Sequence, residues 1–466
     1  MLFSSMTFVY LFLPIVCLLY LASRKDLHNS ILLIASVLFY AWGEPSYLAI
    51  MILTVLVNYV GAVMIEKYEQ RKKIILWLTI AADLSFLIYF KYFNFIIGNI
   101  NKLFAANITA LDVIMPIGIS FYTFQAMSYL IDVYRKDVKA QKDIYKLSLY
   151  ITLFPQLIAG PIVKYHDIEE EIDNRDVSFA NVAYGVKRFI IGLAKKMLIA
   201  NTLGGIADKV FNDKVEGLDA ATAWIGIAAY SFQLFYDFSG YSDMAIGLGR
   251  IFGFHFMENF NYPYIAKSIT EFWRRWHISL STWFKEYLYI PLGSNRVSKF
   301  RNCVNLFVVF LATGIWHGAE WTFVLWGIWH GVFIIFEKLT GWNKEKDSKV
   351  LSFLQHVYAI AVFGLGWVLF RASNIGYAVD YIATLFGIKG SATPMFEKEY
   401  YVGNIEIIAF IAAFLCAVPL FGKMLDIPYE RKWVRAGVNV YLFLLFVLST
   451  MAIAGSTYNP FIYFRF

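Results

Sequence analysis

Apolar segments of near-membrane length alternate with short polar segments along most of this 466-residue chain. A helix needs roughly 20 predominantly apolar residues to cross a bilayer. By that measure we predict spanning helices at 8–22, 47–65, 74–98, 112–133, 221–236, 302–316, 320–337, 351–371, 405–425 and 437–455. The pattern therefore predicts an all-α, polytopic membrane protein with about ten or eleven transmembrane helices.

Three further apolar stretches do not fit simple spans. Residues 147–163 contain Pro155 and Pro161. Proline breaks a membrane helix, which is tolerated where the backbone is buried in protein or lines water, so we predict a re-entrant element there. Residues 178–212 and 268–300 place Lys and Arg beside apolar residues at helical spacing, which predicts interfacial amphipathic helices.

The amino-acid composition agrees with a membrane protein and argues against several other classes of protein. Charged residues make up only 16% of the chain, against roughly 25% in an average soluble domain. No long polar block interrupts the apolar segments, so we predict one integral-membrane domain over residues 1–466. The net charge of +7 lies in loop clusters that fit anionic lipid, and no basic domain indicates nucleic-acid binding. Three cysteines without ligand spacing predict neither a disulfide scaffold nor a zinc site.

The N-terminal segment indicates an orientation. No basic region precedes the apolar run 8–22, and no small-residue cleavage site follows it, so it does not resemble a cleaved signal peptide. Arg24 and Lys25 come directly after the run. The positive-inside rule then places these two residues in the cytoplasm and the N-terminus outside.

Polar and ionisable residues gather inside membrane-grade sequence between Glu271 and Gly331. Three of the seven histidines lie there, each directly after a tryptophan: His277, His317 and His330. An ionisable side chain at bilayer depth is costly and functional by default. Histidine also has the pKa best suited to moving a proton near neutrality.

We expect one of His317 and His330 to be catalytic and the other structural, and the local sequence does not decide which. His317 follows a long apolar run, and is either a general base or a histidine satisfied by a neighbouring helix. Gly314 and Gly318 beside it would let another backbone or a ligand approach closely. On one continuous helix His317 and His330 would face about 140° apart, so both could line one site only if the helix breaks at Gly318.

His277 shares a helical face with Ser281, four residues later. This face is either a second polar wall of the same site or an interfacial belt that holds lipid headgroups. Arg274 and Arg275 in the same segment could bind the phosphates of an acyl-carrier cofactor or those of lipid.

The run 235–244 places two carboxylates, Asp237 and Asp243, six residues apart in an apolar setting. They could orient a histidine or a substrate hydroxyl. For Asp237 we favour a structural role, in which its side chain caps a helix break at Gly240. Farther on, Asn259 and Asn261 indicate an irregular connector before 268–300.

The chain contains five short motifs, which follow one another in this order: Pro116–Tyr122, Leu157–Pro161, Tyr236–Gly247, Trp273–Trp283 and Gly314–Gly318. Together they resemble the membrane-bound O-acyltransferase family, and within it the alginate O-acetylation branch, to which the D-alanyl-teichoic-acid transferases are related. The third motif begins with Tyr where the family has Phe. The core motifs lie within 112–337, and the resemblance weakens over 376–466 apart from the closing hexapeptide 461–466.

The resemblance implies an O-acyltransferase whose spanning, re-entrant and interfacial helices surround a tunnel. It makes His317 the essential histidine and His277 a second functional residue. Supporting roles are expected for Trp316, Ser281, Tyr241, Asp243 and His330.

The resemblance also implies substrates and a location. The enzyme would move an acyl group, by branch expectation acetyl, from a cytoplasmic thioester such as acetyl-CoA across the bacterial cytoplasmic membrane. An extracytoplasmic SGNH-hydrolase-like partner would complete transfer to an extracellular or cell-wall polysaccharide. No permanently bound cofactor is expected.

The chemistry follows in outline. A hydroxyl is a poor nucleophile at pH 7, so His317 would take its proton as it attacks the thioester carbonyl. The oxyanion donor stays open among His277, Ser279, Ser281 and Tyr241, and no metal is required. A flippase of polysaccharide precursors and a non-catalytic scaffold are the competing functions, although no internal repeat supports a transporter.

Overall fold

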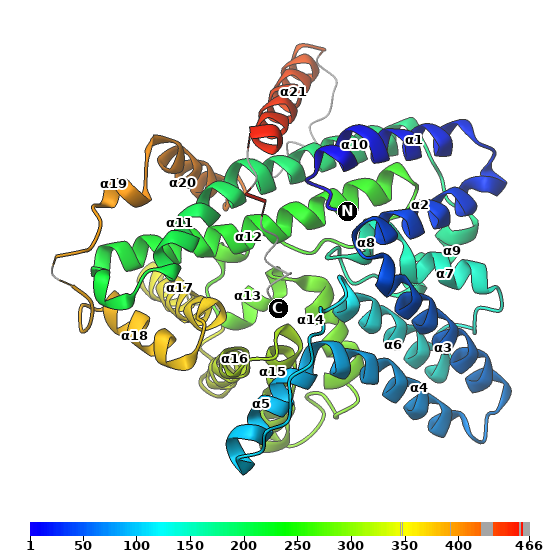
Figure 1. Ribbon diagram of the computed structural model, residues 1–466, viewed down its shortest axis with the longest axis horizontal. Coiled ribbons are helices and arrows are strands. Elements are labelled where there is room, and N and C mark those ends of the chain that lie inside the picture. The colour runs from blue at the N-terminus through cyan, green and yellow to red at the C-terminus, as the bar shows by residue number, and fades with distance from the viewer. Residues whose placement is uncertain (345, 347, 392, 421–431, 456–457, 460–466) are drawn as a thin grey trace. The chain divides into compact units, whose positions relative to one another are not determined.

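The computed structural model describes residues 1–466 except 345, 347, 392, 421–431, 456–457 and 460–466 (Figure 1). The closing hexapeptide 461–466 and part of the predicted span 405–425 therefore lie outside the described residues. Across the rest of the chain the regular structure is helical, and no strand occurs there. The predicted all-α class is confirmed.

The chain divides into two compact units. Unit 1 comprises Met1–Phe189 and Ser242–Met257, and unit 2 comprises Ile190–Tyr241 and Glu258–Phe466. Two helices contribute residues to both units, α10 (Phe179–Ala194) and α12 (Ala220–Ile251).

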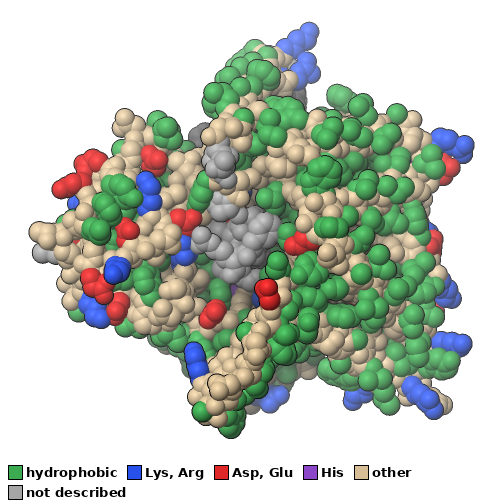
Figure 2. Space-filling view, viewed as in Figure 1, with side chains coloured by type: hydrophobic (Ala, Val, Ile, Leu, Met, Phe, Trp, Pro, Cys, Tyr) green, Lys and Arg blue, Asp and Glu red, His purple; other side chains and the backbone are tan. Residues whose placement is uncertain are grey.

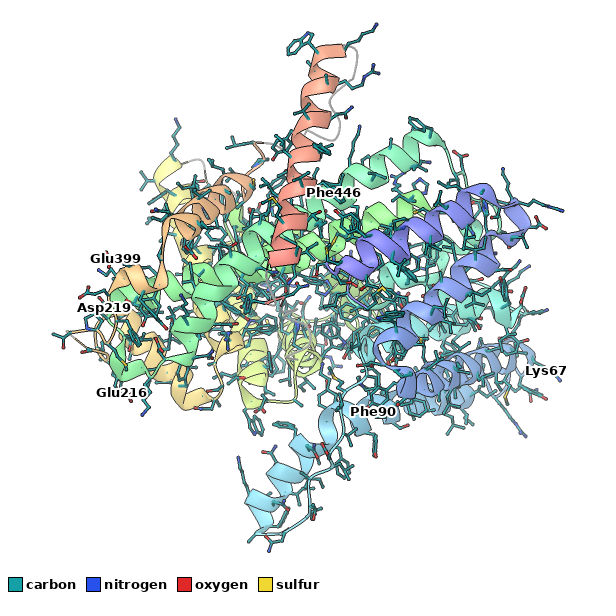
Figure 3. All side chains as sticks on the ribbon, turned by 45° about the horizontal axis from the view of Figure 1, so that its top comes forward. Lys67, Phe90, Glu216, Asp219, Glu399 and Phe446 are labelled. Carbon is teal, nitrogen blue, oxygen red and sulfur yellow. The ribbon has the colours of Figure 1, made fainter. Side chains whose placement is uncertain are left out.

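Unit 1 is a bundle in which α3, α4 and α6 pack on one another. Figure 2 shows that hydrophobic side chains cover much of the visible surface over its helices, with Lys and Arg at the rim; Figure 3 labels one of these, Lys67. Leu18, Leu78 and Trp42 are each more than half exposed, which suits a surface that meets lipid. The helices that lie wholly within this unit are α1 (Leu13–Ala22), α2 (His28–Gly43), α3 (Leu48–Lys67), α4 (Lys72–Leu87), α5 (Phe93–Phe104), α6 (Ile119–Arg135), α7 (Ile144–Thr152), α8 (Phe154–Leu157) and α9 (Tyr165–Asp173).

Six helical segments of the described chain are long and apolar enough to cross a membrane: Pro45–Lys67, Lys72–Phe104, Phe179–Asn212, Trp321–Thr340, Lys349–Arg371 and Lys432–Gly455. The apolar helix at Phe8–Ala22 is shorter. Six is fewer than the ten or eleven expected. One reason is that the predicted span 221–236 belongs to α12, which is buried along most of its 32 residues and so has no need of a lipid-grade surface.

The predicted break within 147–163 is present. Helix α7 ends at Thr152 and α8 begins at Phe154, with Pro155 in its first turn. The amide of Phe154 donates to Ser36 Oγ at 3.0 Å, and Gln156 Nε2 donates to the carbonyl of Tyr150 at 2.6 Å. Protein groups thus satisfy part of the backbone that the break frees, as a buried break requires.

The segment 178–212 differs from the predicted interfacial helix. It forms one helical run through α10, a π-helical turn η5 (Lys195–Ala200) and α11 (Asn201–Asn212), and is among the six candidate spans. Its buried cations have partners: Lys196 Nζ lies 2.6 Å from Asp237 Oδ1, and their side chains are only 2% and 3% exposed. Neutralised charges of this kind have no need of the headgroup region.

The predicted cap at Gly240 is wrong, because α12 continues through it and Asp237 pairs with Lys196 instead. Gly240 serves close packing: a Cβ there would approach the carbonyl oxygen of Gly192 to 2.7 Å.

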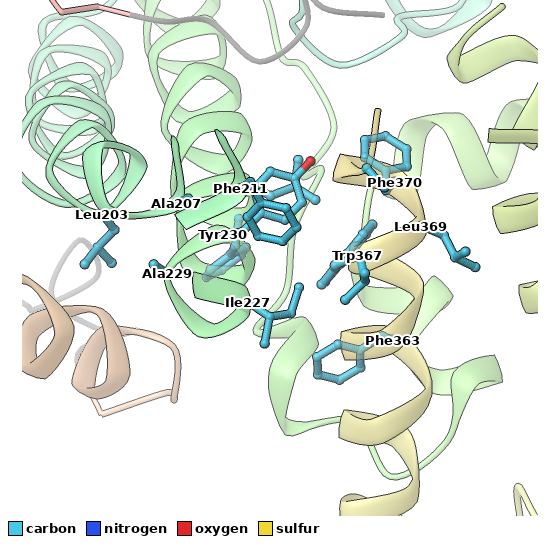
Figure 4. Close-up of a cluster of buried hydrophobic side chains, with 14 of the residues drawn as sticks. Leu203, Ala207, Phe211, Ile227, Ala229, Tyr230, Phe363, Trp367, Leu369 and Phe370 are labelled. Atoms are coloured by element: carbon cyan, nitrogen blue, oxygen red, sulfur yellow. The ribbon is translucent and has the colours of Figure 1, made fainter. Parts of the chain in front are cut away.

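Unit 2 is built around α17 and its neighbours. Figure 4 shows Phe363 and Trp367 on the side of α17 that faces Ile227 and Tyr230 of α12, whereas Leu369 points away. One edge of this unit carries three acidic residues, Glu216 in the 3-10 turn η6 (Val215–Gly217), Asp219 directly before α12, and Glu399 in α19 (Figure 3). Besides α11, the helices that lie wholly within this unit include α13 (Ile269–Arg275), α14 (Ile278–Phe284), the π-turn η8 (Lys285–Tyr289), α15 (Lys299–His317), α16 (Trp321–Thr340), α17 (Lys349–Arg371), α18 (Ile375–Leu385), α19 (Lys398–Tyr401), α20 (Asn404–Cys416) and α21 (Lys432–Gly455).

Candidate active site

Helices α15 and α16 form a tight hairpin that positions His317. A Cβ on Gly314 would approach the carbonyl oxygen of Phe323 to 2.5 Å, so the two backbones touch there. Helix α15 ends at His317, and Gly318 adopts an extended conformation. A Cβ on Gly318 would collide with the ring of Phe323. The predicted close approach at both glycines is present, and its partner is the backbone or ring of the next helix.

His317 lies in an aromatic enclosure and is only 6% exposed. Its ring centroid is 4.9 Å from that of Trp316, 5.0 Å from Trp326 and 5.1 Å from Phe370, each pair in an edge-to-face arrangement. Aromatic walls of this kind keep water away from the imidazole.

His330 lies against the same indole as His317. Its ring is 4.9 Å from that of Trp326, and Trp273 Nε1 donates to His330 Nδ1 at 3.4 Å. The two histidines share one neighbour because the helix does break at Gly318, the condition under which the sequence allowed them to meet. His330 is fully enclosed, and a Cβ on Gly366 would approach its Nε2 to 2.9 Å. These contacts favour a packing role for His330.

His277 occupies the junction between α13 and α14 in a left-handed conformation with φ of 45°. A non-glycine residue holds this conformation only where its surroundings enforce it. Asn259 does so: its Oδ1 accepts from the amide and the hydroxyl of Ser279 at 3.1 and 2.9 Å and lies 3.2 Å from His277 Nδ1. The carbonyl oxygen of Asn259 also accepts from the amide of Ile278 at 3.0 Å.

The burial of His277 determines its protonation state. The side chain is 1% exposed, and this burial lowers the pKa of His277 to about 3. The ring is therefore neutral at pH 7. Since Asn259 Oδ1 is an acceptor, the neutral ring carries its proton on Nδ1 and presents a lone pair at Nε2.

Trp316 connects the two candidate catalytic histidines. Its ring centroid lies 6.3 Å from that of His277 and 4.9 Å from that of His317. The structure thus brings His317, Trp316 and His277 together around one indole. The short helices of segment 268–300 also contact this group of residues, because the ring centroid of Trp273 lies 5.5 Å from that of Trp326.

Three other predicted residues, Ser281, Arg275 and Asp243, have polar partners of their own. Ser281 Oγ donates to the carbonyl of Trp273 at 3.2 Å. Arg275 Nε pairs with Glu271 at 2.9 Å, whereas Arg274 is exposed. Asp243 lies in unit 1, where Arg188 Nη2 is 2.6 Å from its carboxylate, and Tyr241 is buried within α12.

Sequence reasoning missed two parts of the site. Asn259 indicated only an irregular connector, and nothing in the local sequence showed that its side chain would hold His277. Trp326 and Phe370, which enclose His317, come from different helices of the core. Among the residues that the structure describes, no three His, Cys, Asp or Glu side chains gather as metal ligands would.

Comparison with known proteins identifies the family. Residues 34–343, which include His277 and His317, match MBOAT, the membrane-bound O-acyltransferase family. The chain belongs to this family. It is therefore a membrane O-acyltransferase, and the resemblance seen in its motifs is confirmed.

Several curated proteins are similar to this acyltransferase. It is 37% identical to a probable alginate O-acetylase of Pseudomonas putida over the full length of both chains. It is 33% identical to the peptidoglycan O-acetyltransferase of Helicobacter pylori, covering 100% of this chain and 98% of the other. A teichoic acid D-alanyltransferase of Bacillus subtilis is 30% identical over 50% of this chain and 62% of its own.

Proposed function

We propose that this acyltransferase moves an acetyl group from a cytoplasmic thioester, acetyl-CoA, through the bacterial cytoplasmic membrane for O-acetylation of a polysaccharide outside it. An extracytoplasmic SGNH-hydrolase-like partner completes the transfer to the glycan. The observation that carries the proposal is the placement of His317 and His277 around Trp316 in a water-poor aromatic setting. The full-length similarity to an alginate O-acetylase and a peptidoglycan O-acetyltransferase supports the substrate class.

The distribution of charge supports a cytoplasmic donor. Lys338 Nζ at the end of α16 donates to Asn302 Oδ1 near the start of α15 at 2.6 Å, so these two helix ends lie side by side. Six cations lie in the connecting segments and first helical turns at this end: Arg296, Lys299, Arg301, Lys344, Lys346 and Lys349. The positive-inside rule assigns this end to the cytoplasm. His317 is the last residue of α15 and lies about 27 Å along the helix axis from its first residue, Lys299, in the direction of the outer face.

The proposed reaction needs one base and balances without a cofactor. His317 takes the proton of the acceptor hydroxyl as the oxygen attacks the thioester carbonyl. The tetrahedral intermediate then expels the thiolate, which recovers the proton from His317. The aromatic walls of the site limit competing hydrolysis by excluding water.

The tautomer of His277 narrows its role. With Nδ1 donating to Asn259, the neutral ring offers only an acceptor at Nε2, so it orients the attacking hydroxyl rather than stabilising the oxyanion. The oxyanion donor we propose is the indole N–H of Trp326. This fully buried N–H has no hydrogen-bond partner among the described residues, and its ring packs on His317.

The decisive experiment measures O-acetyl content of surface polysaccharide in cells that lack the protein and are complemented at equal membrane levels. Wild type and His330→Gln should restore acetylation, whereas His317→Ala should not. Transfer from acetyl-CoA by the purified protein separates an acyltransferase of this specificity from a flippase or scaffold, which would lack it. Full restoration by His317→Ala would remove His317 as the base.

A further inference from the structure

A basic pocket of about 520 Å³ opens at the start of α17 in unit 2. Three lysines line it, Lys267, Lys346 and Lys349, together with Ser352 and His356. None of the described residues that line the pocket carries a carboxylate. The pocket lies at the basic end of α15–α17, and neither Arg274 nor Arg275, the motif arginines that suggested a phosphate site, is among its described lining residues.

The chemistry of the lining selects phosphate. Lysine ammonium groups are point-charge donors suited to phosphate oxygens, and the Ser352 hydroxyl adds a neutral donor. Lys349 is also the first residue of α17, a helix of 23 residues whose N-terminus carries a partial positive charge. A pocket of this volume holds more than one phosphate group.

The pocket lies between the start of α17 and the segment that begins at Lys267. These two parts of the chain contact each other, and each continues to residues of the active site. His356 Nδ1 lies 3.0 Å from the carbonyl oxygen of Ala266, which connects α17 to the segment that begins at Lys267. That segment continues into α13, whose Trp273 contacts Trp326. Along the other wall, α17 continues to Phe370, which packs on His317.

The separation of pocket and base matches a long donor. His356 and Phe370 lie fourteen residues apart on one helix, which is about 21 Å along its axis. An extended pantetheine arm, which links the phosphates of coenzyme A to its thioester, has a comparable length. A donor anchored in the pocket would thus present its acyl group at the level of His317.

We propose that this pocket binds the phosphate groups of the acyl donor. The assignment rests on the proposed acetyl-CoA specificity and replaces the predicted Arg274 and Arg275, since Arg275 is engaged by Glu271 and by the carbonyl of Asn261. An anionic lipid headgroup offers the same phosphate chemistry, so the experiment separates the two sources.

The test compares wild type with the double variant Lys267→Ala/Lys349→Ala in phosphatidylcholine nanodiscs, which carry no net lipid charge. Two donors are used: acetyl-CoA, and acetyl-pantetheine, which lacks phosphate. The double variant should raise KM for acetyl-CoA about tenfold or more, with kcat within about twofold, and leave KM for acetyl-pantetheine unchanged. Lys267→Arg/Lys349→Arg should retain most of the affinity. The matched control, Lys299→Ala, removes an exposed lysine at the start of α15 and should change neither KM.

Direct binding of coenzyme A separates failure of this inference from failure of the proposed function. If the wild type binds coenzyme A and the double variant does not, the pocket assignment stands, even if no acetyl transfer is found and the proposed function falls. If both bind equally, the assignment is overturned. Equal binding of coenzyme A together with weaker binding of phosphatidylglycerol vesicles by the double variant overturns it in favour of a lipid site.

Discussion

Gly314 of α15 and Gly327 of α16 touch backbone to backbone: a Cβ on either residue would lie 3.0 Å from the Cα of the other. One turn beyond Gly314 stands His317, and next to Gly327 stands Trp326, whose ring packs on that histidine. The distance between the base and its aromatic neighbour therefore depends on two residues that have no side chain.

We expect Gly327→Ala to separate the two helices. The added methyl group would meet the Phe310 carbonyl at 2.5 Å, and overpacking of this kind costs about 1–3 kcal/mol. Thermal unfolding in detergent should show a lower Tm, and acetyl transfer should fall with it. Gly364→Ala in α17 is the matched control, since nothing lies within 4 Å of its Cβ position and a helical alanine is slightly stabilising. Equal Tm values for the two variants would contradict the close contact.

Trp326→Phe tests the proposed oxyanion donor. Phenylalanine keeps an aromatic ring against His317 but removes the indole N–H. Loss of one such donor typically lowers kcat by about 10²–10³-fold, and we expect a decrease of that order with KM little changed. Trp367→Phe removes another buried indole N–H from the same aromatic core and serves as the comparison. A variant at Trp326 with wild-type kcat would exclude it as the donor.

Asn259→Ala should release His277. The change removes the acceptor for the Ser279 amide and hydroxyl and for His277 Nδ1, and each buried group left unsatisfied costs about 1–3 kcal/mol. Both stability and kcat should fall. Asn261→Ala is the matched control, because Asn261 bonds to Arg275 through its backbone N–H and carbonyl and its side chain is exposed. Similar losses in the two variants would mean that the connector, and not the Asn259 side chain, matters.

The buried neutral state of His277 predicts a dependence of stability on pH. Its pKa is about 3 in the folded protein against an ordinary 6.5, so between these values the unfolded state binds more protons. The stability associated with His277 is complete above about pH 6.5 and is lost as the pH falls toward 3, with a slope approaching about 1.4 kcal/mol per pH unit.

His277→Asn isolates this contribution. Asparagine tolerates the left-handed conformation, has an amide that can donate to Asn259, and does not titrate. The difference in unfolding free energy between wild type and variant, followed from pH 7.5 to 4.5, should change in favour of the variant as the pH falls. Parallel curves would show that His277 does not titrate on unfolding.

Some features of this protein follow from the sequence alone. Apolar length and low charge were sufficient for an all-α membrane protein, because a bilayer requires helices whose backbone groups are satisfied internally. The prolines within 147–163 predicted a break that the structure contains. Five motifs in their order resembled the O-acyltransferase family, and the comparisons confirm that class.

Only the tertiary structure decided which polar groups meet. Lys196 and Asp237, which indicated an interfacial helix and a cap, pair inside unit 2, and Lys267 and Lys349 meet in one pocket from positions 82 residues apart. Asn259 holds His277 from across a connector, and the turn at Gly318 brings His330 back to the ring that His317 touches. The physical reason is that lipid and the protein interior are similarly apolar. The hydrophobic pattern of the sequence therefore shows which residues avoid water, but it does not show which residues they contact.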